Sequence, residues 1–316
     1  MDVFNTSITT NDLIFGFIAC LGAIWIGRTL AKKQAHAYKA QRDSGTDAQQ
    51  PSSGGLPTVN HIDFGDMRFL HLGTPWVQGS MKISKPNEIH LEYVQRMMGW
   101  LLLTDLDQVR HLQAMQLGLG AAALTKFCHL QLGMPTTAVE LNPQVIATCR
   151  RWFNLPEDNA KLQVLLANAA DIASRPEWHG KIDALQVDLY DQEAACPALD
   201  SETFYADCRQ LLTQQGCMAI NLYGRESNLE VSMQRIAQAF GKEALWAFKP
   251  TTAGNTVVLA FRTPRTWDKN ALLSQAKQIQ TRWLLPAMKW LKALAPVCAS
   301  TTSDFASASF TSHKKN

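Results

Sequence analysis

Residues 115–123 read MQLGLGAAA, an apolar run that meets two glycines and then three alanines. The apolar residues predict a buried strand. Gly118 and Gly120 predict a sharp turn at its end, because glycine adopts backbone conformations that other residues avoid. Ligands of open α/β sheets bind beyond the carboxyl ends of the strands, where such turns lie. The stretch therefore predicts an α/β fold with a ligand site at the two glycines.

The chain after this stretch alternates between strands and helices. A helix is expected from the glycine turn to about Leu132. Further helices are expected at 143–153, 202–213 and 228–240, and further strands at 137–139, 162–166, 182–187, 217–222, 244–248 and 256–261. Such alternation implies a Rossmann-like, mostly parallel sheet with helices on both faces. The close spacing of the last two strands predicts one antiparallel strand at the sheet edge.

A smaller unit precedes this sheet. The apolar runs 67–72 and 76–81 flank Gly73-Thr74-Pro75 and predict a β-hairpin. Apolar residues recur at helical spacing over 88–103 and predict a helix. The expected domains are an apolar segment with a flexible linker (1–57), the hairpin and helix (58–104), the nucleoside-binding catalytic domain (105–265), a C-terminal helix (266–293) and a disordered tail (294–316).

The N-terminal apolar segment, residues 13–27, carries no charge, and Arg28, Lys32 and Lys33 follow it. Positive charges on this side predict a membrane anchor over 13–30 whose C-terminal side stays in the cytoplasm. The uncharged run is shorter than the ~20 residues that span a bilayer comfortably. The alternative is an apolar helix that packs on a partner or on the domain itself. The expected location is the cytoplasm, with or without this tether.

Composition argues against several classes of function. The net charge is +3, and the basic residues are not concentrated in the central region, so no nucleic-acid partner is expected. The seven cysteines form no CxxC pair, and the histidines show no metal-ligand spacing. We therefore expect neither a metal site nor a disulfide framework, and we expect reduced thiols in a cytosolic compartment.

Glu140 closes the second predicted strand, 20 residues after Gly120. A carboxylate at this place could accept hydrogen bonds from both hydroxyls of a ribose, so the sequence predicts a nucleoside site. Both NAD and an adenosyl sulfonium fit a glycine loop followed by an acid. The alternative is that Gly118 and Gly120 only form a tight turn, and that Glu140 caps the helix that Pro143 opens.

The segment after the acid favours the sulfonium. Glu140-Leu141-Asn142-Pro143-Gln144-Val145-Ile146 resembles the acid-x-[DN]-P-x-V-I run of S-adenosylmethionine-fold proteins. Val77-Gln78 in the hairpin, Glu92-Tyr93 in the next helix and Val187-Asp188-Leu189-Tyr190-Asp191 after the fourth strand are similar to motifs of the spermidine synthases, or polyamine aminopropyltransferases. The resemblance covers about residues 60–262. It implies aminopropyl transfer from decarboxylated S-adenosylmethionine, a co-substrate, to a small polyamine, by a chain that forms homodimers.

The same resemblance assigns roles to individual residues. Asp188 would accept the proton of the attacking amine, and Asp191 would bind the amine. Tyr93 and Tyr190 would line the amine channel, and Gln78 would close over the donor. The remaining donor-binding residues would be Gly118, Gly120, Glu140 and Asn168.

Departures from the family pattern leave two alternatives open. Ala121 stands where the family's glycine loop carries an aspartate, and Val94 stands where it carries a histidine. Ala167-Asn168-Ala169 replaces the adenine motif G-D-[AG], and Gln192 replaces a proline. An S-adenosylmethionine-dependent methyltransferase is the first alternative. A non-catalytic nucleoside-binding protein of the same fold is the second.

Overall fold

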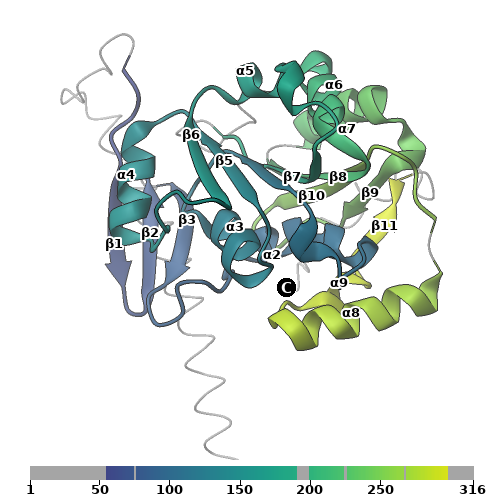
Figure 1. The fold of residues 1–316 in the computed structure, drawn as a ribbon, viewed down its shortest axis with the longest axis horizontal. Coiled ribbons are helices and arrows are strands. Elements are labelled where there is room, and N and C mark those ends of the chain that lie inside the picture. Colours follow the sequence, from purple (N-terminus) through teal and green to yellow (C-terminus); the bar gives the residue numbers. More distant parts are fainter. Residues whose placement is uncertain (1–54, 75, 191–198, 224–225, 267, 298–316) are drawn as a thin grey trace, which may run out of the picture. The chain divides into compact units, whose positions relative to one another are not determined.

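A computed structural model describes residues 55–74, 76–190, 199–223, 226–266 and 268–297. They form a three-stranded antiparallel sheet and an eight-stranded mixed sheet (Figure 1). Within these residues, no helix is long and apolar enough to cross a membrane. The segment 13–27 lies outside the described residues, so the membrane anchor stays a prediction.

The larger sheet contains the five predicted parallel strands in the order β8-β7-β4-β5-β6. These strands are β4 (Ala114–Leu117), β5 (Thr136–Glu140), β6 (Leu162–Leu166), β7 (Ile182–Val187) and β8 (Leu212–Tyr223). The chain builds outward from β4 to β6 and then returns to place β7 on the other side of β4. Ligands of such sheets bind where the strand order reverses, which here is at the carboxyl ends of β4 and β7.

The antiparallel part of this sheet differs from the expectation. β10 (Asn255–Phe261) is antiparallel, as predicted, but it lies between β8 and β9 (Leu245–Phe248) rather than at the edge. All seven residues of β10 are buried, as is expected of a strand with neighbours on both sides. The edge strand on this side of the sheet is β11 (Leu294–Pro296), which pairs with β9. The predicted start of the disordered tail at residue 294 is therefore too early.

Helices cover both faces of the larger sheet (Figure 1). One face packs against α2 (Glu92–Met97), the 3₁₀ segment η1 (Met98–Leu103), α8 (Lys269–Trp283) and α9 (Ala287–Trp290). The other face packs against α5 (Ala169–Ala173), α6 (Glu202–Leu211) and α7 (Glu226–Phe240). α4 (Pro143–Trp152) contributes to a third cluster, with the small sheet and the glycine loop. Neighbouring strand residues such as Ala114 and Met115 belong to opposite faces, as the strand alternation requires.

Two predicted helices are less regular than expected. The helix after the glycine turn has one α-helical turn, α3 (Ala123–Lys126), followed by the π-helical segment η3 (Phe127–Gln131). The helix predicted over 88–103 begins only at Glu92 and continues as η1. Four other helices start at side-chain caps, because Asn142, Asn168, Ser201 and Asp268 each accept a hydrogen bond from the first helical turn.

The predicted hairpin is present and carries an additional strand. β2 (Met67–His71) and β3 (Val77–Lys82) are the two predicted strands, and β1 (Asn60–Phe64) extends the sheet. A Cβ atom on Gly79 of β3 would lie 2.7 Å from the Ala121 nitrogen, so the backbone of β3 packs directly on the glycine loop. The small sheet thus forms one wall of the predicted ligand site.

Lys126 of α3 is buried beneath this wall and is 1% exposed. Its Nζ donates hydrogen bonds to the carbonyl oxygens of Pro86 and Phe153, each at 2.6 Å, and lies 3.3 Å from the Met81 sulfur. The ammonium therefore links β3, the segment before α2 and the end of α4. Burial lowers the pKa of Lys126 to about 8.

We expect Lys126→Met to remove a pH-dependent part of the free energy of unfolding. Between about pH 8 and the ordinary lysine pKa of 10.5, the folded chain binds fewer protons at Lys126 than the unfolded chain. In the wild type, burial of the Lys126 ammonium therefore lowers the free energy of unfolding in full below pH 8. This cost shrinks as the pH rises above 8, by at most about 1.4 kcal/mol per pH unit. Denaturant unfolding at about pH 7.5 and 9.5 should show wild type gaining stability relative to the variant. The same difference in free energy of unfolding at both pH values would contradict the lowered pKa of Lys126.

Candidate active site

The loop after β4 has a backbone that requires glycine. Gly118 has a φ of +87°, Gly120 a φ of +50° and Ala122 a φ of +58°. A Cβ atom on Gly118 would overlap the carbonyl oxygen of Asp188, so the loops after β4 and β7 are in direct contact. The glycine predicted as a turn residue is therefore also needed for this close approach.

Glu140 at the end of β5 holds this loop. Its Oε2 accepts a hydrogen bond from the Leu119 nitrogen at 3.0 Å, and its Oε1 accepts one from the Asn142 nitrogen at 2.9 Å. The cap of α4 is Asn142, whose Oδ1 accepts from the Gln144 nitrogen, so Glu140 is not the helix cap. Burial raises the pKa of Glu140, and these backbone hydrogen bonds oppose the rise. A ribose could bind to the lone pairs that remain on the carboxylate.

Asp188 follows β7 and is held by two side chains from other elements. Asn221 of β8 donates a hydrogen bond to its Oδ1 at 2.9 Å, and the Tyr93 hydroxyl of α2 lies 3.4 Å from its Oδ2. Burial raises the pKa of Asp188, and both hydrogen bonds oppose this rise. The pKa of Tyr93 is also raised well above its ordinary value, by burial and then by the Asp188 charge. Tyr93 is therefore a neutral donor to a carboxylate.

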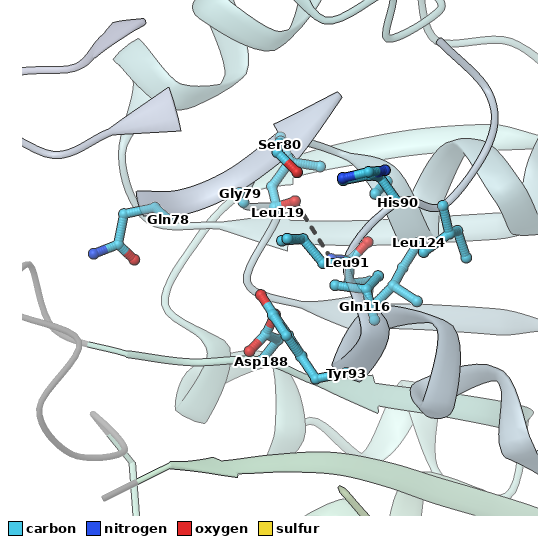
Figure 2. A pocket seen from close by; sticks show the side chains of 15 residues that line it. Gln78, Gly79, Ser80, His90, Leu91, Tyr93, Gln116, Leu119, Leu124 and Asp188 are labelled. Carbon is cyan, nitrogen blue, oxygen red and sulfur yellow. Dashed lines mark hydrogen bonds between the residues drawn. The ribbon is translucent and has the colours of Figure 1, made fainter. Parts of the chain in front are cut away.

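A pocket opens between β3, α2 and the glycine loop (Figure 2). Asp188 is the one carboxylate among its lining residues. Figure 2 shows the side chains of Tyr93 and Asp188 next to each other on one side of the pocket. The structure thus brings four predicted site residues to one pocket, namely Gln78, Tyr93, Gly120 and Asp188.

Tyr190 and Asn168 are not among the residues that line the pocket. The Tyr190 hydroxyl donates to the carbonyl oxygen of Asn221 at 2.8 Å, and its ring packs edge-on against Tyr223. Asn168 is exposed at the start of α5, where its Oδ1 accepts from the Ala170 nitrogen. Asp191 lies outside the described residues. The roles predicted for these three residues stay predictions.

Three polar residues of the site were not predicted. Ser80 of β3 lines the pocket, is 4% exposed, and its hydroxyl has no hydrogen-bond partner in the part of the chain that the structure describes. Gln116 of β4 is buried, accepts a hydrogen bond from the Thr125 hydroxyl, and donates to the Gly118 carbonyl oxygen at 2.6 Å. Asn221 binds Asp188. For Gln116 the available signal is a single polar residue in the apolar strand β4, and for Asn221 it is a single polar residue in the apolar run 217–222.

No group of three or more His, Cys, Asp or Glu side chains that could hold a metal ion occurs among the residues placed by the structure.

Comparison with known proteins identifies the family. No protein-family model matches the sequence. The chain is 32% identical over 248 residues to the polyamine aminopropyltransferase of Neisseria meningitidis serogroup A, a match that covers 78% of this chain and 92% of the relative. The chain belongs to the polyamine aminopropyltransferase family. Its membership confirms the resemblance seen in the sequence, and it places the chain among transferases.

Solved structures confirm the fold. A probable spermidine synthase from Corynebacterium glutamicum aligns with a TM-score of 0.62 at 18% identity, over 86% of this chain and 98% of that chain. Human methyltransferase-like protein 13, in complex with SAH, aligns with a TM-score of 0.56 at 20% identity, over 62% of this chain and 93% of that chain. The mostly parallel sheet is therefore of the S-adenosylmethionine type, as predicted.

We expect Glu140→Gln to weaken binding of decarboxylated S-adenosylmethionine. The substitution keeps the size of the side chain but removes the charge from its hydrogen bonds, which are worth about 1.5–3 kcal/mol each when charged. Calorimetric titration should show a clear loss of affinity, whereas Glu157→Gln, at an exposed position, should bind as wild type does. Unchanged affinity in Glu140→Gln would place the ribose elsewhere.

Proposed function

We propose that this chain transfers the aminopropyl group of decarboxylated S-adenosylmethionine to a small polyamine. The observation that carries the proposal is the Asp188 carboxylate, which lines the pocket, contacts the glycine loop through its backbone and is hydrogen-bonded by Asn221 and Tyr93. Family membership supports the same reaction.

The reaction needs an uncharged amine nitrogen at the carbon next to the sulfonium. The nitrogen forms a bond to that carbon, the carbon–sulfur bond breaks with its electrons going to sulfur, and a neutral thioether leaves. The surplus proton of the new secondary ammonium passes to a base, for which we assign Asp188. Its negative charge also attracts the cationic polyamine. Burial raises the pKa of Asp188, which makes the carboxylate a better proton acceptor than an exposed aspartate.

The other residues of the site bind and orient. Gly118, Gly120 and Glu140 would hold the nucleoside at the ends of β4 and β5. Tyr93 would fix the second oxygen of Asp188. Asp191 and Tyr190 would bind the acceptor amine. Homodimer formation and a cytoplasmic location, tethered through residues 13–30, are further parts of the proposal.

The proposal and the methyltransferase alternative differ in which donor the protein binds, decarboxylated S-adenosylmethionine or S-adenosylmethionine itself. The observation that favours the alternative is Ala121, which brings no acid to the loop and is packed against Gly79. Calorimetric titration with both donors should show binding of decarboxylated S-adenosylmethionine. Tight binding of S-adenosylmethionine alone would support the methyltransferase, and binding of neither would support a non-catalytic protein.

We expect Asp188→Asn to lower the transfer rate by ~10²–10⁴-fold, the usual range for the loss of a positioned general base. Donor affinity should persist, because Glu140 and the glycine loop are unchanged. The loss should shrink at high pH, where more of the acceptor amine arrives uncharged. Single-turnover rates across pH measure this, with Asp171→Asn on α5 as the control. Transfer near the wild-type rate in Asp188→Asn would remove the residue from the mechanism.

A further inference from the structure

We infer that Asn255 is a positioning residue for Asp188, which it reaches through the side chain of Asn221. The inference rests on the proposed role of Asp188 as the base. Asn255 is not among the residues that line the pocket, and it lies on the antiparallel strand β10.

The three side chains form a chain of hydrogen bonds. Asn255 Nδ2 donates to Asn221 Oδ1 at 3.1 Å, and Asn221 Nδ2 donates to Asp188 Oδ1 at 2.9 Å. Asn255 is 9% exposed and Asn221 is 4% exposed, so water has little access to either amide. Buried polar chains of this kind are sensitive to the loss of one member, because the partner left behind loses its hydrogen bond.

The donor and acceptor groups of the three side chains fix the direction of these hydrogen bonds. An ionised carboxylate only accepts hydrogen bonds, so Asn221 must present its NH₂ group to Asp188. Its carbonyl oxygen then points the other way and needs a donor. Asn255 provides that donor. Without it, the Asn221 amide can rotate and present its oxygen to Asp188, and this orientation repels the ionised carboxylate and favours the protonated one.

The backbone on both sides is held in place, so rotation of the amide is the least costly response. The Asn221 carbonyl oxygen accepts from the Tyr190 hydroxyl at 2.8 Å. At the start of β10, the Asn255 nitrogen donates to the Thr251 hydroxyl at 3.1 Å, and the Thr251 nitrogen donates to the Asn255 carbonyl oxygen at 2.8 Å. Asn255 is therefore presented to Asn221 by a fixed turn.

The titratable group that hydrogen-bonds to Asp188 is Tyr93 from α2, whose pKa is raised, whereas Asn221 from β8 and Asn255 from β10 carry no charge. The Asn221 hydrogen bond thus favours the ionised form of Asp188 without adding a charge, and Asn255 acts on Asp188 only by orienting Asn221. A change at Asn255 should appear in the pH dependence of transfer rather than in donor affinity.

The test is Asn255→Leu, which keeps the approximate volume and removes the donor. We expect kcat to fall about tenfold near neutral pH, the acid limb of the kcat/KM profile to move to higher pH, and the donor KM to stay unchanged. Thr256→Val, at the next buried position of β10, is the control and should leave the profile in place. If the thermal transition shows that Asn255→Leu does not fold, Asn255→Ala replaces it as the test variant.

A double-mutant cycle separates positioning from general damage. In the Asp188→Asn background there is no carboxylate to ionise, so Asn255→Leu should cause no further loss and no pH shift. An equal loss in both backgrounds, or an acid limb that does not move in the single variant, would overturn the inference while leaving Asp188 as the base. Transfer near the wild-type rate in Asp188→Asn alone would overturn both this inference and the proposed function.

Discussion

The site depends on a backbone contact that only glycine permits. Because Gly118 has no side chain, the Asp188 carbonyl oxygen occupies the place where a Cβ atom would be. The strands are held at this point by hydrogen bonds from the Gly118 nitrogen to Val139 and from the Asp188 nitrogen to Leu117. β4, β5 and β7 therefore end together, and the groups that follow them meet around one loop.

This arrangement brings two carboxylates to the same loop with different surroundings. Glu140 is bound by backbone nitrogens, so its position follows from the loop itself. Asp188 is bound by side chains from α2 and β8, so its position depends on the packing of separate elements. Burial raises both pKa values. The first carboxylate suits a fixed binding role, and the second suits a group whose ionisation changes during a reaction.

The sequence predicts the parts of the fold that are set by local pattern. Strands such as 162–166 and 182–187 are predicted because apolar residues dominate them and turns bound them. Glu140 and Asp188 are predicted because they stand at the ends of such strands. The position of β10 was not found, because an apolar run reports burial but not which strands flank it. β1 was missed because its residues are largely exposed. The hydrogen bond between Asn221 and Asn255 was not predicted for the same reason, because it joins β8 to β10 and the sequence does not show that these strands are neighbours.

The position of β10 has a consequence for the order in which a newly made chain becomes competent. Synthesis from the N-terminus completes the glycine loop, Glu140, Asp188 and β8 before Asn255 is added. β10 must then pair between β8 and the already synthesised β9, a long-range step that follows the local ones. A nascent chain that ends before this strand carries the donor-binding elements but not the asparagine behind the base. The acid–base apparatus is thus complete only once β10 has paired with β8.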